Sequence, residues 1–190
     1  MSVKSLKAFG WALAAVATAV TLSRCGGKSP AQPTDPNDPL QAPQAAAVIN
    51  DLRNLQTVTA PFRDFSAAQA GGYTTKVTDC MTDPQGGMGF HYGKGAAIDA
   101  NVVAAEPEVL LYEPKGGGSL ELVGVEYIVP LDAWKGASPP TLYGQTFRRN
   151  ETFQVWALHA WVWKANPSGV FADWNPRVSC AGAPMSHHAH

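Results

Sequence analysis

The sequence predicts an α+β fold, in which two amino-terminal helices pack on a mainly antiparallel β-sheet that can curl into a partial barrel. Apolar residues recur at helical spacing before residue 70. After residue 87 the pattern changes to short apolar or alternating runs separated by Gly and Pro, which is typical of strands. The Gly-rich segment 115–119 separates two of these runs and predicts an antiparallel hairpin.

The two helices are predicted over residues 45–56 and 59–70. Thr59 is the expected N-cap of the second helix, because Pro61 follows it in the first turn. The residues expected to face the core are Val48, Ile49, Leu52, Leu55, Phe62, Phe65 and Ala68. A loop rich in turn formers is expected over residues 74–87.

Four strands are expected after this loop, each bounded by turn-forming residues. They are predicted over residues 88–92, 109–112, 120–129 and 152–164. The long connection 132–150 and the Pro-rich closing segment 166–180 are expected to be irregular.

The amino terminus is typical of a bacterial export signal. Lys4 and Lys7 precede an uncharged stretch, residues 8–22, that is short for a membrane-spanning helix. The domain organisation predicted from composition is a signal sequence over 1–25, a flexible Pro- and Gly-rich tether over 26–43, one globular domain over 44–182 and a His-containing tail over 183–190. We therefore expect an extracytoplasmic protein.

The segment Leu22-Ser23-Arg24-Cys25 resembles the lipobox of bacterial lipoproteins, in which the cysteine is lipidated. Lipidation would anchor the protein to a membrane of the cell envelope or periplasm through Cys25. Arg24 departs from the pattern, because lipoboxes usually carry a small residue at that position. Cleavage after residues 17–19 is the alternative, and it would give a secreted protein in which Cys25 is an ordinary thiol.

Cysteine parity predicts a disulfide. If Cys25 is lipidated, Cys80 and Cys180 remain as an even pair in an oxidising compartment. This bond would close a loop of roughly 100 residues and contribute about 4 to 5 kcal/mol in the chain-entropy model. The alternative is two unpaired buried thiols.

Charge and motifs argue against several classes of function. The formal net charge is −1 and no basic stripe is present, so nucleic acid is not an expected partner. Residues 116–118 lack the Lys-Ser/Thr and the following helix of a phosphate-binding loop. Ser119 and Ser179 lack the G-x-S-x-G elbow of a nucleophilic hydrolase.

Two histidines and one glutamate lie inside predicted strands, where each side chain projects to a definite face. His91, Glu126 and His159 are hypothesised to converge on one divalent metal ion, Zn, Fe or Mn. The alternatives are a pocket without metal and a core histidine hydrogen-bonded to a buried glutamate. Glu113, before a proline at a strand end, is the reserve carboxylate and is expected to face solvent or cap the turn. The histidines of the 183–190 tail are either a flexible tract that captures metal or a frayed tail without function.

Aromatic residues suggest a second kind of site, for a glycan or a small apolar ligand. Strand parity places Trp161 and Trp163 on the face of His159, with Trp156 opposite. The residues proposed to bind such a ligand are Tyr92, Trp161, Trp163 and Trp174. The alternatives are that these aromatics belong to the core, and that the protein is a structural or interaction module.

Several blocks occur together in a familiar order: residues 86–92 (GGMGFHY), 107–114 (PEVLLYEP), 122–127 (LVGVEY) and 159–163 (HAWVW), followed by Asn-Pro and Trp-Asn-Pro within 166–176. Their order and spacing resemble a family of small exported bacterial proteins without an assigned reaction. The resemblance covers about residues 62–180 and implies a single exported domain. It implies no activity, ligand or catalytic residue.

Overall fold

The computed structural model describes residues 42–183, and the structural statements below concern this part of the chain. The expected signal sequence with Cys25, most of the tether and the terminal histidines lie outside the described residues. Within the described part, no helix combines the length and the apolar character needed to cross a membrane.

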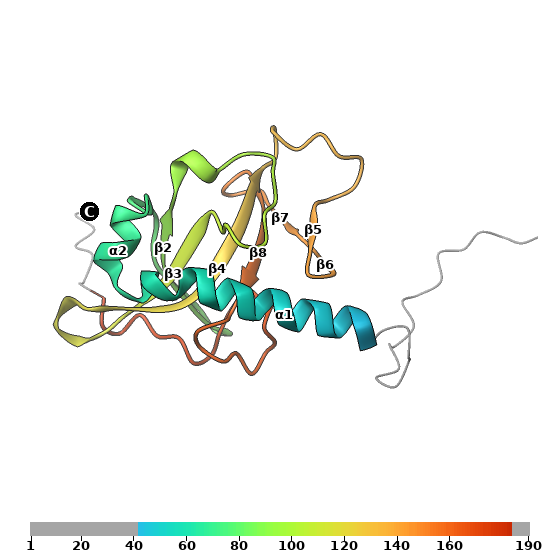
Figure 1. Cartoon of the computed structure of the whole chain (residues 1–190). Helices are drawn as coiled ribbons and strands as arrows, with labels where there is room; N and C mark the ends of the chain where they lie inside the picture. Colours follow the sequence, from blue (N-terminus) through green and yellow to red (C-terminus); the bar gives the residue numbers. More distant parts are fainter. Residues whose placement is uncertain (1–41, 184–190) are drawn as a thin grey trace, which may run out of the picture. The chain divides into compact units, whose positions relative to one another are not determined.

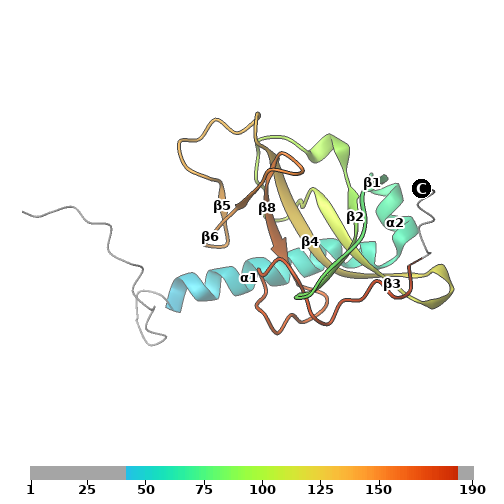
Figure 2. The ribbon, with the colours of Figure 1, turned by 180° about the vertical axis from the view of Figure 1, so that it is seen from behind.

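The fold is α+β, and its main feature is a six-stranded antiparallel sheet that curls into a half-barrel (Figures 1 and 2). The strand order is β1-β2-β3-β4-β8-β7, and β5 and β6 form a separate two-stranded hairpin. The elements are α1 (Ala42–Thr59), α2 (Phe65–Ala70), β1 (Thr75–Asp83), β2 (Gly86–Gly93), β3 (Val109–Pro114), β4 (Leu120–Pro130), β5 (Thr141–Leu142), β6 (Gln145–Thr146), β7 (Arg148–Asn150) and β8 (Val155–Ala160).

The helical part differs from the prediction at its second helix. α1 is longer than expected, whereas the expected helix over 59–70 is a 3-10 turn (Ala60–Arg63) followed by the six-residue α2. Thr59 does not cap a helix with its side chain; its hydroxyl donates to the Leu55 carbonyl at 2.6 Å. Pro61 explains the break, because proline has no N–H for a continuing helix. Asp64 caps α2 by accepting the Ser66 N–H at 2.9 Å.

The strands after residue 87 follow the prediction at β2, β3 and β4, but the expected loop over 74–87 is wrong. Strand β1 occupies most of it, with three register irregularities against β2. Its residues are mostly exposed or half-buried, as an edge strand allows, so no apolar alternation marks it in the sequence. The expected strand over 152–164 is shorter, because the backbone turns at Gln154, where φ is 54°, and leaves the sheet after Ala160.

The sheet has an apolar core on each face. On one face, Leu110, Tyr127 and Leu158 belong to a large buried cluster in which Leu55 of α1 also lies. On the opposite face, Leu111 and Trp161 belong to a smaller cluster with the closing-segment residue Val178. The two faces therefore have different surroundings, and the second is free of α1.

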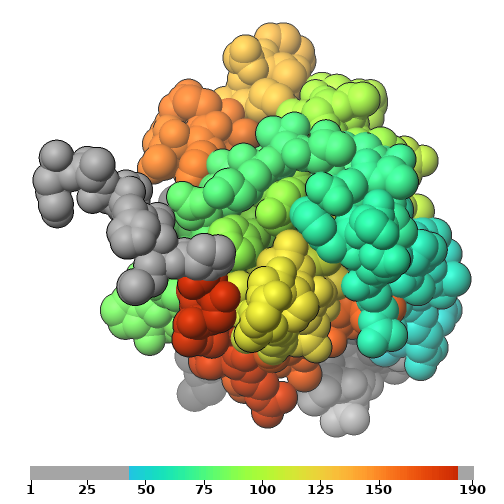
Figure 3. Space-filling view, turned by 90° about the vertical axis from the view of Figure 1, so that its left-hand side faces the viewer, coloured from blue at the N-terminus to red at the C-terminus, as the bar shows by residue number. Residues whose placement is uncertain are grey.

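The closing segment 172–180 lies against the turn between β1 and β2. Gly87 and Asn175 exchange two backbone hydrogen bonds of 3.0 Å, and the bond between Cys80 and Cys180 confirms the predicted disulfide. A side chain at Gly86 would lie 2.4 Å from the Asn175 backbone, so glycine is required for this approach. Figure 3 shows the end of this segment, in red, beside the 115–120 turn, in yellow.

Replacing both Cys80 and Cys180 by alanine is expected to lower the free energy of unfolding by about 2–4 kcal/mol, because a loop of about 100 residues is no longer closed in the unfolded chain. Chemical denaturation without reductant measures the difference. The matched control is Cys25→Ser, which should leave the stability of the folded domain unchanged. Equal stability of the double variant and the wild type would contradict this account of the disulfide.

Candidate metal centre

Strand pairing brings two of the three predicted ligands together. Glu126 of β4 lies directly opposite His159 of β8 in the antiparallel register. Directly opposed residues have Cβ atoms about 4.5–5.5 Å apart on the same face of a sheet. On its other edge, β4 pairs with β3, and Glu126 lies opposite Val109. The same face of the sheet therefore continues across three neighbouring strands.

His91 comes from β2, two strands away from Glu126. In the antiparallel register, His91 lies opposite Leu111 of β3, and Leu111 is on the same face of the sheet as Glu126. The His91 imidazole therefore projects from that face. The curl of the sheet shortens the remaining distance between His91 and Glu126. Edge strands β1 and β7 would be about 24 Å apart in a flat sheet of six strands, yet Thr78 of β1 and Asn150 of β7 line the same pocket. The sheet therefore curls toward the His91 face.

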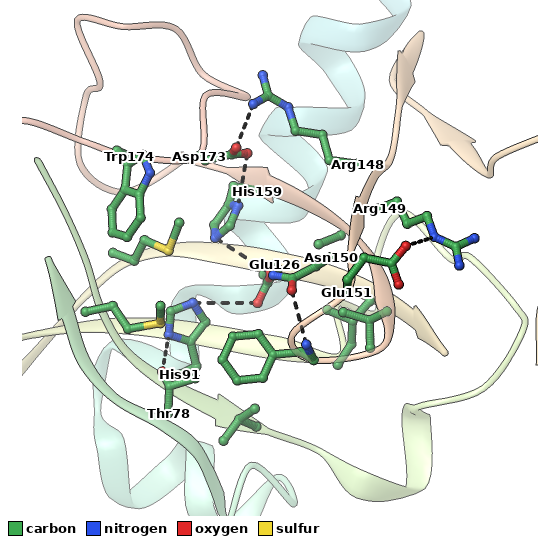
Figure 4. A pocket seen from close by; sticks show the side chains of 17 residues that line it. Thr78, His91, Glu126, Arg148, Arg149, Asn150, Glu151, His159, Asp173 and Trp174 are labelled. Carbon is green, nitrogen blue, oxygen red and sulfur yellow. Dashed lines mark hydrogen bonds and ion pairs between the residues drawn. The ribbon is translucent and has the colours of Figure 1, made fainter. Parts of the chain in front are cut away.

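The three side chains form one compact cluster (Figure 4). His91 Nε2 lies 3.6 Å from Glu126 Oε2, and His159 Nε2 lies 3.7 Å from Glu126 Oε1. One ligand atom from each residue lies within 4.8 Å of the others. Among the described residues, neither ring nitrogen of His159 has a hydrogen-bond partner. The prediction that these residues converge on one face is thus confirmed.

The separations fit metal ligands better than hydrogen bonds. Distances of 3.6 and 3.7 Å are too long for an N–H···O bond, which needs about 2.7–3.2 Å. Two ligands at about 2.0–2.2 Å from a tetrahedral ion lie roughly 3.3–3.6 Å apart. Because the three ligand atoms lie within 4.8 Å of one another, an inward movement of the side chains would bring all three onto one ion and leave further coordination positions open.

Each imidazole has a polar neighbour on the side away from Glu126. The Thr78 hydroxyl lies 2.7 Å from His91 Nδ1. Asp173 Oδ1 lies 3.8 Å from His159 Nδ1, and Arg148 holds the other Asp173 oxygen at 2.6 Å. A hydrogen bond from such a neighbour fixes the orientation of a histidine ligand and leaves its second nitrogen for the metal. Thr78 is within hydrogen-bond distance of His91, whereas Asp173 stands beyond it from His159. The Nε2 atoms of both rings face Glu126.

Trp161 also fixes the His159 ring. The two rings are nearly parallel, at an angle of 7° with centroids 6.0 Å apart, and the indole Nε1 donates to the Ala172 carbonyl at 2.6 Å. Gly124 leaves room for this indole, since an added Cβ would lie 3.2 Å from Trp161 Cε3. The same hydrogen bond holds the chain immediately before Asp173, so one tryptophan positions both His159 and its carboxylate neighbour.

Burial controls the protonation of the cluster. The side chains of His91 and His159 are each 5% exposed and that of Glu126 is 12% exposed. Burial, aided by the His159 charge, lowers the pKa of His91 to about 3. Burial also raises the pKa of Glu126, against the opposing effect of His159. The pKa of Asp173 is lowered, chiefly by the His159 ring and further by Arg148.

The cluster lies in a pocket of about 450 Å³, a volume typical of small-molecule sites. Residues of both sheet edges line it, together with Asp173 and Trp174 of the closing segment (Figure 4). Asp173, Arg148 and Thr78 were not predicted as site residues. No local pattern identifies them, because the unpredicted edge strands β1 and β7 place Thr78 and Arg148 here and the path of the closing segment places Asp173.

The aromatic residues proposed to bind a ligand are not brought together. Trp161 is buried in the cluster on the His159 face, whereas Trp163 packs in the cluster on the α1 face and donates to the Thr59 hydroxyl at 3.0 Å. Their predicted common face is wrong because the chain leaves β8 after Ala160. Tyr92 packs against Phe65 of α2 on that same α1 face. Trp174 alone of the four lines the pocket.

Glu113, the reserve carboxylate, is also placed elsewhere. It is buried and accepts the Ser179 N–H at 2.8 Å, with Lys115 and Lys164 as ion-pair partners. These contacts connect β3 to the closing segment. The prediction of a solvent-facing residue is therefore wrong, and Glu113 has a structural role.

Comparison of the chain with models of protein families, with curated proteins and with solved structures finds no match. The resemblance to a family of small exported proteins therefore stays a prediction.

In the metal-free protein we expect the free energy of unfolding to fall as the pH is lowered from about 6.5 to 3. The unfolded chain takes up a proton at His91 in this range, whereas the folded chain does not until its pKa of about 3. The contribution of one proton is at most about 1.4 kcal/mol per pH unit. Chemical denaturation of the wild type and of His91→Leu at several pH values gives the slope of the unfolding free energy against pH for each protein. The difference between the two slopes is the contribution of His91.

Glu126 has the opposite effect, since its raised pKa lowers stability as the pH rises. Glu126 is present in both the wild type and His91→Leu, and its pKa depends on burial, His159 and Asp173. Its contribution therefore cancels in the difference between the two slopes. A His187→Gln variant, altered in the tail, is the matched control and should keep the wild-type slope. Identical slopes for wild type and His91→Leu would show that His91 titrates normally in the folded protein.

Proposed function

We propose that this protein is an exported metalloprotein in which His91, His159 and Glu126 hold one divalent ion at the base of the pocket. The observation that supports this is the cluster itself, with three ligand atoms within 4.8 Å and a buried His159 whose nitrogens have no hydrogen-bond partner within residues 42–183. Binding a cation would satisfy these nitrogens and compensate the buried carboxylate. A hydrogen-bonded His–Glu pair in the core, the simplest alternative, requires shorter distances than those found.

Two imidazoles and one carboxylate suit Zn, Fe(II) or Mn(II), and they leave coordination positions open. Such an ion supplies Lewis-acid chemistry or, if it is iron, chemistry with oxygen. The surrounding residues would contribute orientation and the exclusion of water. Thr78 and Asp173 would hold the two rings, and Trp161 would cover His159.

We further propose that the protein works outside the cytoplasm, exported by residues 1–25 and anchored to a membrane through a lipid on Cys25. The Cys80–Cys180 disulfide supports an oxidising compartment, because such bonds are rare in reducing ones. The Pro- and Gly-rich residues after Cys25 would separate the anchor from the domain.

Metal binding is tested on the full chain with His187, His188 and His190 replaced by serine, so that the tail cannot contribute. We expect one equivalent of Zn²⁺ per chain in equilibrium dialysis of metal-depleted protein. His91→Ala, His159→Ala and Glu126→Gln should each weaken binding by about 100-fold or more, and Asp173→Asn by about 10- to 100-fold, as typical for an outer partner. Stoichiometric metal in the double variant His91→Ala/His159→Ala would refute the proposal.

The matched control is Glu121→Gln, which removes a carboxylate that is 53% exposed and does not line the pocket. It should bind metal as the parent does. Near-ultraviolet circular dichroism shows whether each variant keeps its packed aromatic core, so that loss of metal can be separated from loss of the fold.

The lipid anchor is tested by Cys25→Ser in a bacterial host. We expect the wild type to incorporate an alkyne-tagged fatty acid and to sediment with membranes, and the variant to lose both properties. The mass of the mature protein provides an independent check. A mature chain that begins near residue 20, with an unmodified Cys25, would contradict lipidation and favour secretion.

A further inference from the structure

We propose that the pocket binds a small organic monocarboxylate, whose carboxylate occupies the open positions on the metal and whose apolar body fills the space above it. The inference rests on the proposed metal centre and names the class of ligand for that site. It follows from the surface of the pocket, from the partners of its polar groups and from its net charge.

Most of the exposed surface of the pocket is apolar. The apolar lining residues come from the β1–β2 hairpin, from β4, from the β8 side and from the closing segment; they are Val77, Met81, Met88, Ile128, Phe153, Val155, Ala157 and Trp174. A volume of about 450 Å³ accepts a molecule of the size of an aromatic acid. Burying the apolar part of such a ligand supplies the binding free energy.

The polar groups at the rim already have partners. Arg148 is paired with Asp173 at 2.6 Å, and Arg149 with Glu151 at 2.6 Å. The Asn150 side-chain oxygen accepts the Phe153 N–H at 3.1 Å. A sugar needs many hydrogen bonds to replace its water, whereas most of the exposed surface of this pocket is apolar and its charged groups are already paired with one another. One polar head on the metal and an apolar body suit the pocket better.

The charges of the pocket favour a monoanion. A divalent ion with one carboxylate and two neutral imidazoles carries a net charge of +1, and the two arginine–carboxylate pairs add none. A monocarboxylate neutralises this charge, because each of its oxygens can coordinate the ion. A dianion such as hydrogen phosphate would leave a negative charge next to Glu126 and Asp173, which is unfavourable in a mostly apolar site.

Phe153 allows the pocket wall to be changed without altering the metal centre. It lines the pocket from the turn between β7 and β8, its side chain is 44% exposed, and it is not among the clustered ligands. Phe153→Ala should therefore fold and bind metal. The matched control is Val103→Ala, which is equally exposed, at 44%, but lies outside the pocket lining.

The experiment uses the full chain with its tail histidines replaced by serine and loaded with Co²⁺, whose visible absorption reports changes in its ligands. The probes are benzoate, acetate, benzyl alcohol and inorganic phosphate. We expect benzoate to change the cobalt spectrum with an affinity at least about tenfold above that of acetate, because the phenyl ring is buried. Benzyl alcohol and phosphate should bind more weakly than benzoate.

Phe153→Ala should lower the affinity for benzoate several-fold and leave that for acetate unchanged, whereas Val103→Ala should alter neither. If Co²⁺ binds but benzoate binds no better than acetate, or phosphate binds best, the ligand class proposed here is wrong and the metal centre stands. If no Co²⁺ binds at the three ligands, the proposed function and this inference both fail.

Discussion

The burial of the Glu126 carboxylate between two imidazoles is the constraint on which the rest of the structure depends. A buried carboxylate is costly unless a proton, a donor or a cation compensates it, and here the nearest imidazole nitrogens stand 3.6 and 3.7 Å away. The surrounding contacts hold this arrangement open: Thr78 orients His91, Trp161 packs parallel to the His159 ring, and the Asp173 carboxylate lies 3.8 Å from His159 Nδ1. A protein that only needed to fill its core would gain stability from apolar residues at these positions.

Much of the sheet could be predicted from the sequence, because β2, β3 and β4 are bounded by clear turn signals and carry apolar runs. β1 could not be predicted, since an edge strand with mostly exposed or half-buried residues has no periodic apolar pattern. The end of β8 was missed for another reason. Side chains alternate between the two faces only while the chain stays in the sheet. The backbone N–H of Trp161 donates instead to the Val170 carbonyl, which lies outside the sheet.

The residues of the candidate site also divide into those that the sequence could predict and those that it could not. His91, Glu126 and His159 could be found because a polar residue inside an apolar strand requires a partner on a definite face. Asp173 could not, because its place depends on a closing segment held by the Gly87–Asn175 bridge and the Cys80–Cys180 bond. Arg148 could not either, because it lies on the short edge strand β7, which was not predicted and is placed by its pairing with β8. Local patterns thus identify residues that must be buried, whereas contacts between distant segments decide what surrounds them.

Crystallography with anomalous scattering tests the central claim most directly. Crystals of the full chain grown with Zn²⁺ and measured on both sides of the zinc absorption edge should show one strong peak about 2.0–2.2 Å from Nε2 of His91, Nε2 of His159 and an oxygen of Glu126. A peak at this position, with Asp173 within hydrogen-bond distance of His159 Nδ1, is the predicted result. A structure without zinc between these residues, in which Glu126 closes to hydrogen-bond distance of a histidine, would contradict the account.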